Sequence, residues 1–124
     1  MYFQKDWLMR QIEDMIRIIA KIYFGKDFSK YEIVDQTHMT ETDVWYKTLL
    51  ALVDQRRLGE AEDLLFDTID TDNAHHMSVA LDFYHTLNAL SDEELEDADF
   101  AREEVRDGLK QICELFGIPA AALL

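Results

Sequence analysis

The chain has 124 residues, 48% of them hydrophobic and 31% charged, with a single cysteine and a net charge of −14. A chain of this size can bury a core, which excludes a protein that is disordered by composition or held together by disulfides. The negative charge excludes nucleic acid and anionic membrane surfaces as partners, because both attract cationic proteins. No apolar run approaches the ~20 residues of a membrane helix. The length fits one domain over residues 1–124, and the single cysteine fits a reducing cytoplasm, so we expect a cytoplasmic protein.

Charge is distributed unevenly along the chain. Residues 1–31 carry six basic and four acidic side chains, a net charge of +2, so the remaining 93 residues carry −16. A mildly basic end and a strongly acidic body can attract each other within one molecule or between two. The simpler interpretation is a solvated acidic surface that keeps the protein soluble.

Residues 3–24 show the periodicity of one long helix. Apolar side chains recur at spacings of three and four and form a single stripe: Leu8, Ile12, Met15, Ile16, Ile19, Ile22 and Tyr23. Gly25 follows as a left-handed stop. Phe3, Trp7, Met9 and Ile18 fall beside the stripe and make the apolar surface wider than one partner helix covers. We therefore expect this helix either to be buried on two sides within its own domain or to meet a second subunit.

Two capping signals follow the long helix. Ser29 and Glu32 form a capping box, which predicts a short helix that ends at about Gln36. Thr40 is a second cap and predicts a helix that reaches about Arg56.

A tight helix hairpin is the centre of the predicted fold. Another helical pattern runs to about Thr68, and only a break of one or two residues around Gly59 separates it from the preceding helix. Two helices joined this closely fold back on each other as an antiparallel hairpin. We predict this hairpin over about residues 41–70, with Ala61 as the small residue that lets the helices approach.

The rest of the chain continues with helices. Residues 74–90 form one apolar face, and the capping box from Ser91 to Glu94 starts either a short helix that ends near Ala98 or a longer one. Helical spacing continues to Gly117, so the C-terminal helices span about residues 74–117, followed by an apolar tail that is either frayed or docked. No stretch has the period of a strand. The predicted fold class is all-α, with six or seven helices and no sheet.

The hairpin resembles a tetratricopeptide repeat. That pattern places a large aromatic residue early in the first helix, and alanine and a bulky residue four apart in the second. The matching positions in this chain are Trp45, Leu52, Leu58, Ala61 and Leu65. The chain departs from the pattern at Leu49, Thr68 and Asn73, where a small residue, alanine and proline are usual. The resemblance implies a small domain of antiparallel hairpins, an α-α superhelix, with a role in binding proteins.

The whole chain also resembles an uncharacterised family of short bacterial proteins, mainly from Firmicutes. The shared stretches are residues 6–13, Asp-Trp-Leu-Met-Arg-Gln-Ile-Glu, and residues 59–66, Gly-Glu-Ala-Glu-Asp-Leu-Leu-Phe. This similarity implies a helical, tetratricopeptide-like fold and a cytoplasmic setting. It implies no reaction, ligand or catalytic residue.

The histidines are the candidates for a metal site. Asp72, His75 and His76 place a carboxylate within one helical turn of two imidazoles, and His85 lies two to three turns further on. Divalent metals accept such ligands, although neither an HExxH nor a paired Glu-x-x-His motif is present. A surface or capping role is the simpler interpretation of these side chains.

No catalytic constellation emerges elsewhere in the sequence. The acidic run at residues 93–99 lacks the turn glycine of a Ca²⁺ loop and is typical of a solvated face or of a docking strip for a basic partner. Cys113 lies on an apolar helical face and is expected to be a buried thiol. We therefore predict no enzyme, no catalytic residue and no cofactor.

The sequence favours a non-catalytic protein-protein interaction or self-association module. The partner is an unknown protein or peptide, or a second copy of the chain bound through the first helix. The alternative is a metal-binding helical protein that uses His75, His76 and His85 with nearby carboxylates.

Overall fold

A computed structural model describes residues 6–123, which contain six α-helices, one 3₁₀ helix and no strand. The elements are α1 (Asp6–Phe24), α2 (Glu41–Asp54), α3 (Leu58–Thr68), α4 (Ala74–Asn88), α5 (Asp92–Asp97), α6 (Arg102–Leu115) and η1 (Ala120–Leu123). The predicted all-α fold class is confirmed. Phe3 and the start of the predicted first helix lie outside the described residues. Between residues 6 and 123, no helix combines the length and the apolar character that a membrane span requires.

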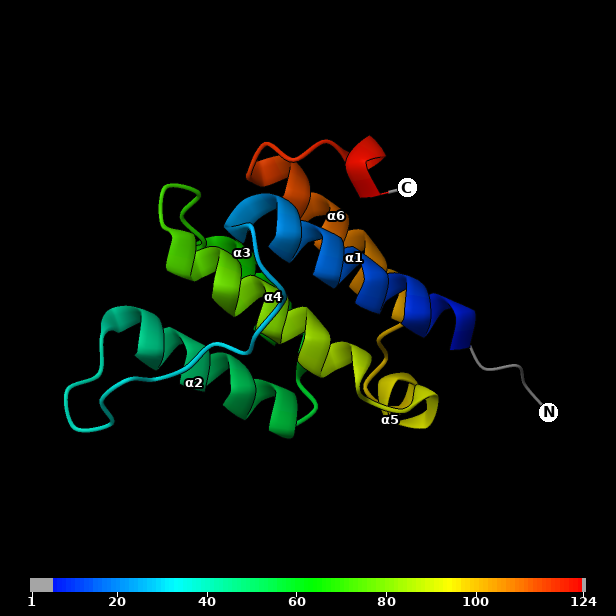
Figure 1. Cartoon of the computed structure of the whole chain (residues 1–124). Coiled ribbons are helices and arrows are strands. Elements are labelled where there is room, and N and C mark those ends of the chain that lie inside the picture. The colour runs from blue at the N-terminus through cyan, green and yellow to red at the C-terminus, as the bar shows by residue number, and fades with distance from the viewer. Residues whose placement is uncertain (1–5, 124) are drawn as a thin grey trace.

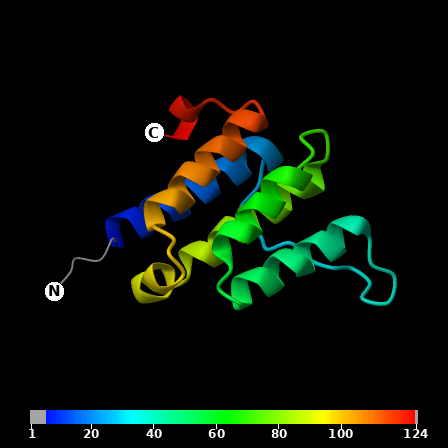
Figure 2. The same cartoon turned by 180° about the vertical axis from the view of Figure 1, so that it is seen from behind.

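Helix α4 lies in the middle of the molecule (Figure 1). Helices α1 and α6 pack on one side of it and α2 on the other, while α3 packs against α2. Figure 2 shows the molecule from behind, with α3 in front of α4. Helices α1 and α6 run in the same direction, so the rings of Tyr23 and Phe116 meet near their C-terminal ends, with centroids 5.5 Å apart. η1 packs on both of these helices.

Local signals define the starts of two helices. The side chains of Thr40 and Ser91 accept hydrogen bonds from the third backbone N–H of α2 and α5, and Asp43 and Glu94 accept bonds from the cap residues in return. Such a cap contributes about 0.5–2 kcal/mol to stability. Of the two options for the helix after Ser91, the short one is observed, because α5 ends at Asp97.

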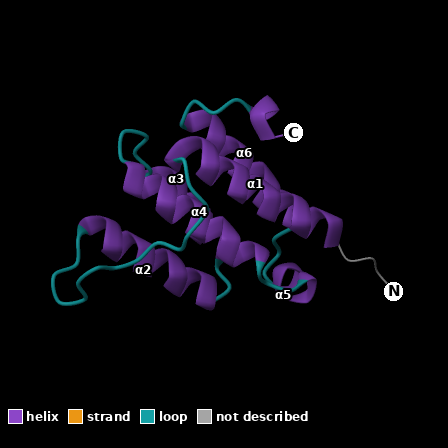
Figure 3. Ribbon diagram, viewed as in Figure 1, coloured by secondary structure: helices purple, strands orange, loops and turns teal. Residues whose placement is uncertain are grey.

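The short helix predicted over residues 29–36 is wrong. Residues 25–40, here named the strap, run without a helix across α4 and α2 before they turn into α2 (Figure 3). The Tyr31 N–H, which would lie in the first turn of that helix, donates to the Asp82 carboxylate of α4 at 3.1 Å. A contact across 51 residues therefore replaces the local capping box.

The hairpin turn lies earlier than predicted. α2 ends at Asp54 and α3 begins at Leu58, so Gly59 is the second residue of a helix and not part of the break. Arg56 forms the turn with a left-handed backbone, φ 60°. Its guanidinium donates to the Val53 carbonyl at 2.9 Å, and this bond holds the turn without a glycine.

A buried arginine closes the corner between α4 and α6. Arg102 is 2% exposed, and its guanidinium donates over 2.8–3.1 Å to both oxygens of Asn88, to the Leu90 carbonyl and to the Asp92 carboxylate. These bonds use the carbonyls at the end of α4. The helix therefore stops at Asn88, two residues before the predicted end at residue 90.

Candidate interaction surface

The outer face of α1 carries large apolar side chains in water. The buried residues of α1 end at Ala20, so the prediction that Ile22 belongs to the buried stripe is wrong: Ile22 is 51% exposed and Trp7 is 58% exposed. At 100° per residue, Trp7, Ile18 and Ile22 lie within about 60° of one another, and about 22 Å of helix separates the first from the last. These three residues are here named the α1 stripe.

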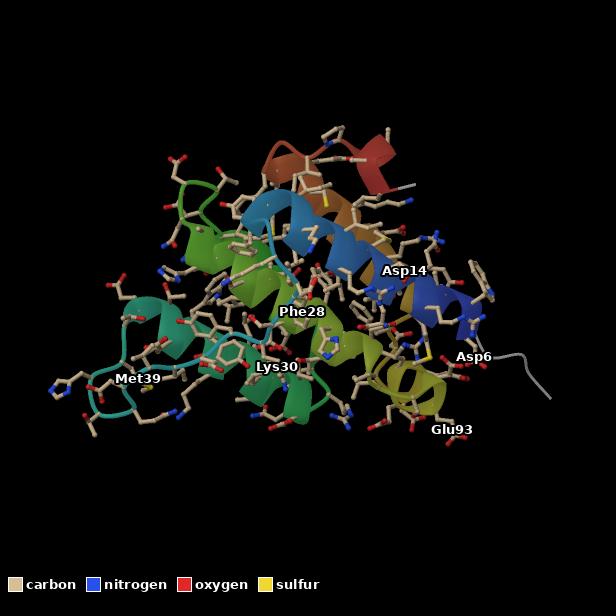
Figure 4. All side chains as sticks on the ribbon, viewed as in Figure 1. Asp6, Asp14, Phe28, Lys30, Met39 and Glu93 are labelled. Carbon is tan, nitrogen blue, oxygen red and sulfur yellow. The ribbon has the colours of Figure 1, made fainter. Side chains whose placement is uncertain are left out.

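Charged side chains flank the α1 stripe, and the sign of their charge changes along the helix. Asp6 and Asp14 lie toward the start of the helix and Arg17 and Lys21 toward its end, and all four are exposed, with Arg10 as the exception to the order. Asp14 and Arg17 form an ion pair at the surface. Figure 4 shows Asp6 at the start of α1 and Asp14 further along it. The two halves of this flank therefore differ in charge.

Leu115, the last residue of α6, adds a further exposed apolar side chain near the C-terminal end of α1. It is 48% exposed and precedes Phe116, whose ring contacts Tyr23. Because Tyr23 directly follows Ile22, the exposed side chains of Leu115 and Ile22 belong to the same end of the α1–α6 pair.

His76, one of the predicted metal ligands, has a structural role. Its side chain is 8% exposed, its ring lies 4.5 Å from that of Trp45, and its Nδ1 accepts a hydrogen bond from the Asp70 N–H at 2.9 Å. Burial lowers the pKa of His76 below its usual value of 6.5. The neutral ring thus secures the connection between α3 and α4.

His85 belongs to a separate polar group further along α4. Its Nδ1 lies 3.0 Å from Glu13 Oε1, and its ring lies 5.1 Å from that of Phe28 in the strap. Glu13 also accepts a bond from the Asn88 side-chain amide at 2.7 Å. This group ties α1, α4 and the strap together.

The predicted metal ligands do not converge. Asp72 and His75 are exposed near the start of α4, and the Asp72 N–H donates to the Asp70 carboxylate at 2.9 Å. Among residues 6–123, no group of three or more His, Cys, Asp or Glu side chains could hold a metal ion. His75, His76 and His85 instead lie in three different surroundings.

Asp82 anchors the strap, although no sequence motif marks it as functional. Its carboxylate is fully buried and accepts hydrogen bonds from the Tyr31 N–H at 3.1 Å, the Tyr46 hydroxyl at 2.6 Å and the Thr86 hydroxyl at 3.3 Å. The only sequence signal is an acidic residue inside the apolar run at residues 79–84. Such a residue needs buried donors, but the sequence does not say which ones.

Two more tyrosine hydroxyls donate to carboxylates. The Tyr31 hydroxyl donates to Asp43 in α2, and burial raises the pKa of Tyr31 to about 12. The Tyr84 hydroxyl donates to Glu62 Oε2 at 2.7 Å, and burial raises the pKa of the Glu62 carboxyl above its usual value. These bonds fix the strap on α2 and α3 on α4.

Two other candidates for reactive groups remain, Cys113 and the acidic run at residues 93–99. Cys113 is fully buried, which raises the pKa of its thiol to about 11, so the predicted buried thiol is confirmed. In the acidic run, Glu94 caps α5 and pairs with Arg56, whereas Glu93 is exposed on α5 (Figure 4).

One family of known sequences matches the chain. The model described as "Family of unknown function (DUF6483)" matches residues 2–117. No curated protein and no solved structure matches the chain. Because the family model covers most of the 124 residues, the chain belongs to the DUF6483 family, a family of unknown function.

Proposed function

We propose that this chain is a non-catalytic protein-interaction module that self-associates through the outer face of α1. The observation that carries the proposal is the exposure of Trp7 and Ile22, 58% and 51%, on a helix whose opposite face is buried. Tryptophan is enriched at protein interfaces.

The apolar side chains at the two ends of the α1 stripe favour a second copy of the chain as the partner. In a two-fold interface, residue i of one subunit contacts residue j of the other, and j contacts i. When two α1 helices pair antiparallel, Trp7 of each copy lies opposite Ile22 of the other. The acidic side chain of Asp14 then approaches the basic side chain of Arg17 across the interface, twice over.

The α2–α3 hairpin is the second element of the proposed module. Trp45 Nε1 donates to the Leu64 carbonyl at 3.4 Å, and Ala61 is fully buried where the two helices pack. These contacts support a tetratricopeptide-like hairpin, which lies on the other side of α4 from α1. The proposed setting of the module is cytoplasmic. The metal-binding alternative gains no support, because the histidines lie in separate surroundings.

Sedimentation equilibrium of the wild-type chain tests the proposal. We expect a dimer with twice the chain mass of 14.6 kDa, and monomers with unchanged circular dichroism for Trp7→Glu and Ile22→Glu. Val34→Glu is the matched control and should remain dimeric, because Val34 is 95% exposed but lies on the strap. A wild-type chain that stays monomeric at every concentration would sink the proposal.

Charge reversal tests the antiparallel arrangement separately. Asp14→Arg or Arg17→Asp alone places like charges opposite each other and should weaken the dimer. The double variant restores opposite charges and should recover it. A dimer that forms but shows no recovery in the double variant would rule out this pairing of the helices.

A further inference from the structure

A cavity of about 280 Å³ opens between the end of α1, the beginning of the strap and the first turns of α4. Its apolar lining includes Ala20, Phe24, Phe28 and Leu81. Two of these side chains, Phe24 and Phe28, are phenyl rings. Figure 4 shows Phe28 where the strap passes over α4.

Polar side chains that also line the cavity are available to a ligand. Lys26, Ser29, His75 and Ser78 line it, and none of them has a side-chain hydrogen-bond partner within residues 6–123. All four side chains can donate a hydrogen bond to an anion, and the Lys26 ammonium also carries a positive charge. The cavity therefore combines an apolar wall with unused donors.

Asp27, the acidic lining residue, is paired with Lys21. The side chain of Asp27 is 96% exposed, and its carboxylate lies 3.4 Å from Lys21 Nζ. The N–H of His75 already donates to the Asn73 side chain. Recognition of an anion would therefore rest on side chains and not on the backbone N–H groups at the start of α4. Much of the cavity belongs to residues 1–31, the part of the chain with net positive charge.

We propose that this cavity binds a small aromatic carboxylate. The ring packs between Phe24, Phe28 and Leu81, while the carboxylate meets the Lys26 ammonium and the Ser78 hydroxyl. Because a cavity of about 150 Å³ holds benzene, this larger volume admits one ring with a short acidic chain. Apolar walls with a few polar groups that fix orientation are the usual composition of a small-molecule site.

Titration with 3-phenylpropionate tests the proposal, with 3-phenylpropanamide and 2-phenylethylammonium as a neutral and a cationic probe of similar size. We expect saturable binding of the carboxylate, with NMR shifts at Ala74, Ser78 and Leu81, and weaker binding of the other two probes. Lys26→Ala should weaken carboxylate binding about fivefold, as expected for an exposed ion pair, and leave amide binding unchanged. Lys30→Ala is the matched control on the same strap, outside the cavity, and should bind like the wild type.

A second variant tests the position of the site. Ser78→Leu fills the cavity and should abolish binding of all three probes while circular dichroism stays unchanged. Absence of saturable binding, equal affinity for the three probes, or binding that persists in Ser78→Leu would each overturn the proposal. The monomeric Trp7→Glu variant should still bind the carboxylate, so failure of the ligand site and failure of the dimer are distinguishable.

Discussion

Gly108 in α6 lets three helices meet. A Cβ at this position would lie 2.6 Å from Glu62 Oε2 in α3 and 2.6 Å from Tyr84 Cζ in α4. Neither side chain can withdraw without breaking the partly buried hydrogen bond between the Tyr84 hydroxyl and Glu62. We expect Gly108→Ala to lower the free energy of unfolding by about 1–3 kcal/mol, measured by urea denaturation.

Gly59 supplies the opposite result in the same experiment. It lies inside α3, and a Cβ there would meet no atom within 4 Å. Alanine is the better helix former, so Gly59→Ala should raise the free energy of unfolding by about 0.5–1 kcal/mol. A neutral Gly108→Ala, or a destabilising Gly59→Ala, would contradict this account of the two glycines.

His76 gives the stability a dependence on pH. Burial lowers the pKa of His76 in the folded state, so its neutral form is favoured there. The contribution of the neutral ring to the free energy of unfolding is fully present above the unfolded pKa of 6.5. It is lost as pH falls through the folded pKa, by at most about 1.4 kcal/mol per pH unit. In urea denaturation between pH 8 and 5, the wild-type chain should lose more stability than His76→Gln. Equal slopes would show that the ring titrates alike in both states.

At the scale of the elements, the strap depends on the buried carboxylate of Asp82. Tyr46→Phe removes one donor from this carboxylate and should lower the free energy of unfolding by about 1–3 kcal/mol. It should also speed hydrogen exchange of the Tyr31 amide, which donates to the same carboxylate. Tyr23→Phe is the control, because the Tyr23 hydroxyl has no hydrogen-bond partner in the described part of the chain. Its effect should stay within about 0.5 kcal/mol, and an equal effect of both substitutions would contradict the role of Asp82.

The sequence predicted best those helices whose first residue is set by side chains nearby in the sequence. Thr40 and Ser91 cap their helices through residues three positions away, and such pairs can be read from spacing alone. The helix predicted from the Ser29 capping box does not form, and the Tyr31 N–H instead donates to a residue 51 positions away. The position of the hairpin turn was predicted wrongly because the residue with the left-handed backbone is Arg56 and not a glycine.

The candidate surface was predictable only in part. Excess apolar width on the first helix was visible in the sequence through Trp7 and Ile18, but periodicity also assigned Ile22 to the buried stripe. Its exposure depends on where α4, α6 and η1 end against α1, which spacing does not encode. The surroundings of His76 and His85 likewise depend on side chains from distant segments, Trp45 and Glu13.

At the scale of the whole molecule, the net charge of −14 makes the fold sensitive to salt. Like charges repel one another in the compact state, and salt screens this repulsion within a Debye length of about 8–10 Å. We expect added NaCl to raise the thermal unfolding midpoint at pH 7, measured on the monomeric Trp7→Glu variant so that subunit contacts play no part. The effect should fade near the isoelectric point of 4.4. A midpoint that falls with salt at pH 7 would mean that attractive pairs dominate the surface.

The order in which the helices are synthesised has a consequence for α1. This helix leaves the ribosome before α4, α6 and η1, on which it packs, whereas α2 and α3 contact each other as soon as both have emerged. About 90 residues separate the end of α1 from the end of α6, which at ~5–20 residues per second is a wait of roughly 5–20 s. During that interval the apolar side of α1 has no α6 to cover it. In the nascent chain, α1 is therefore open to chaperones until α6 has been synthesised.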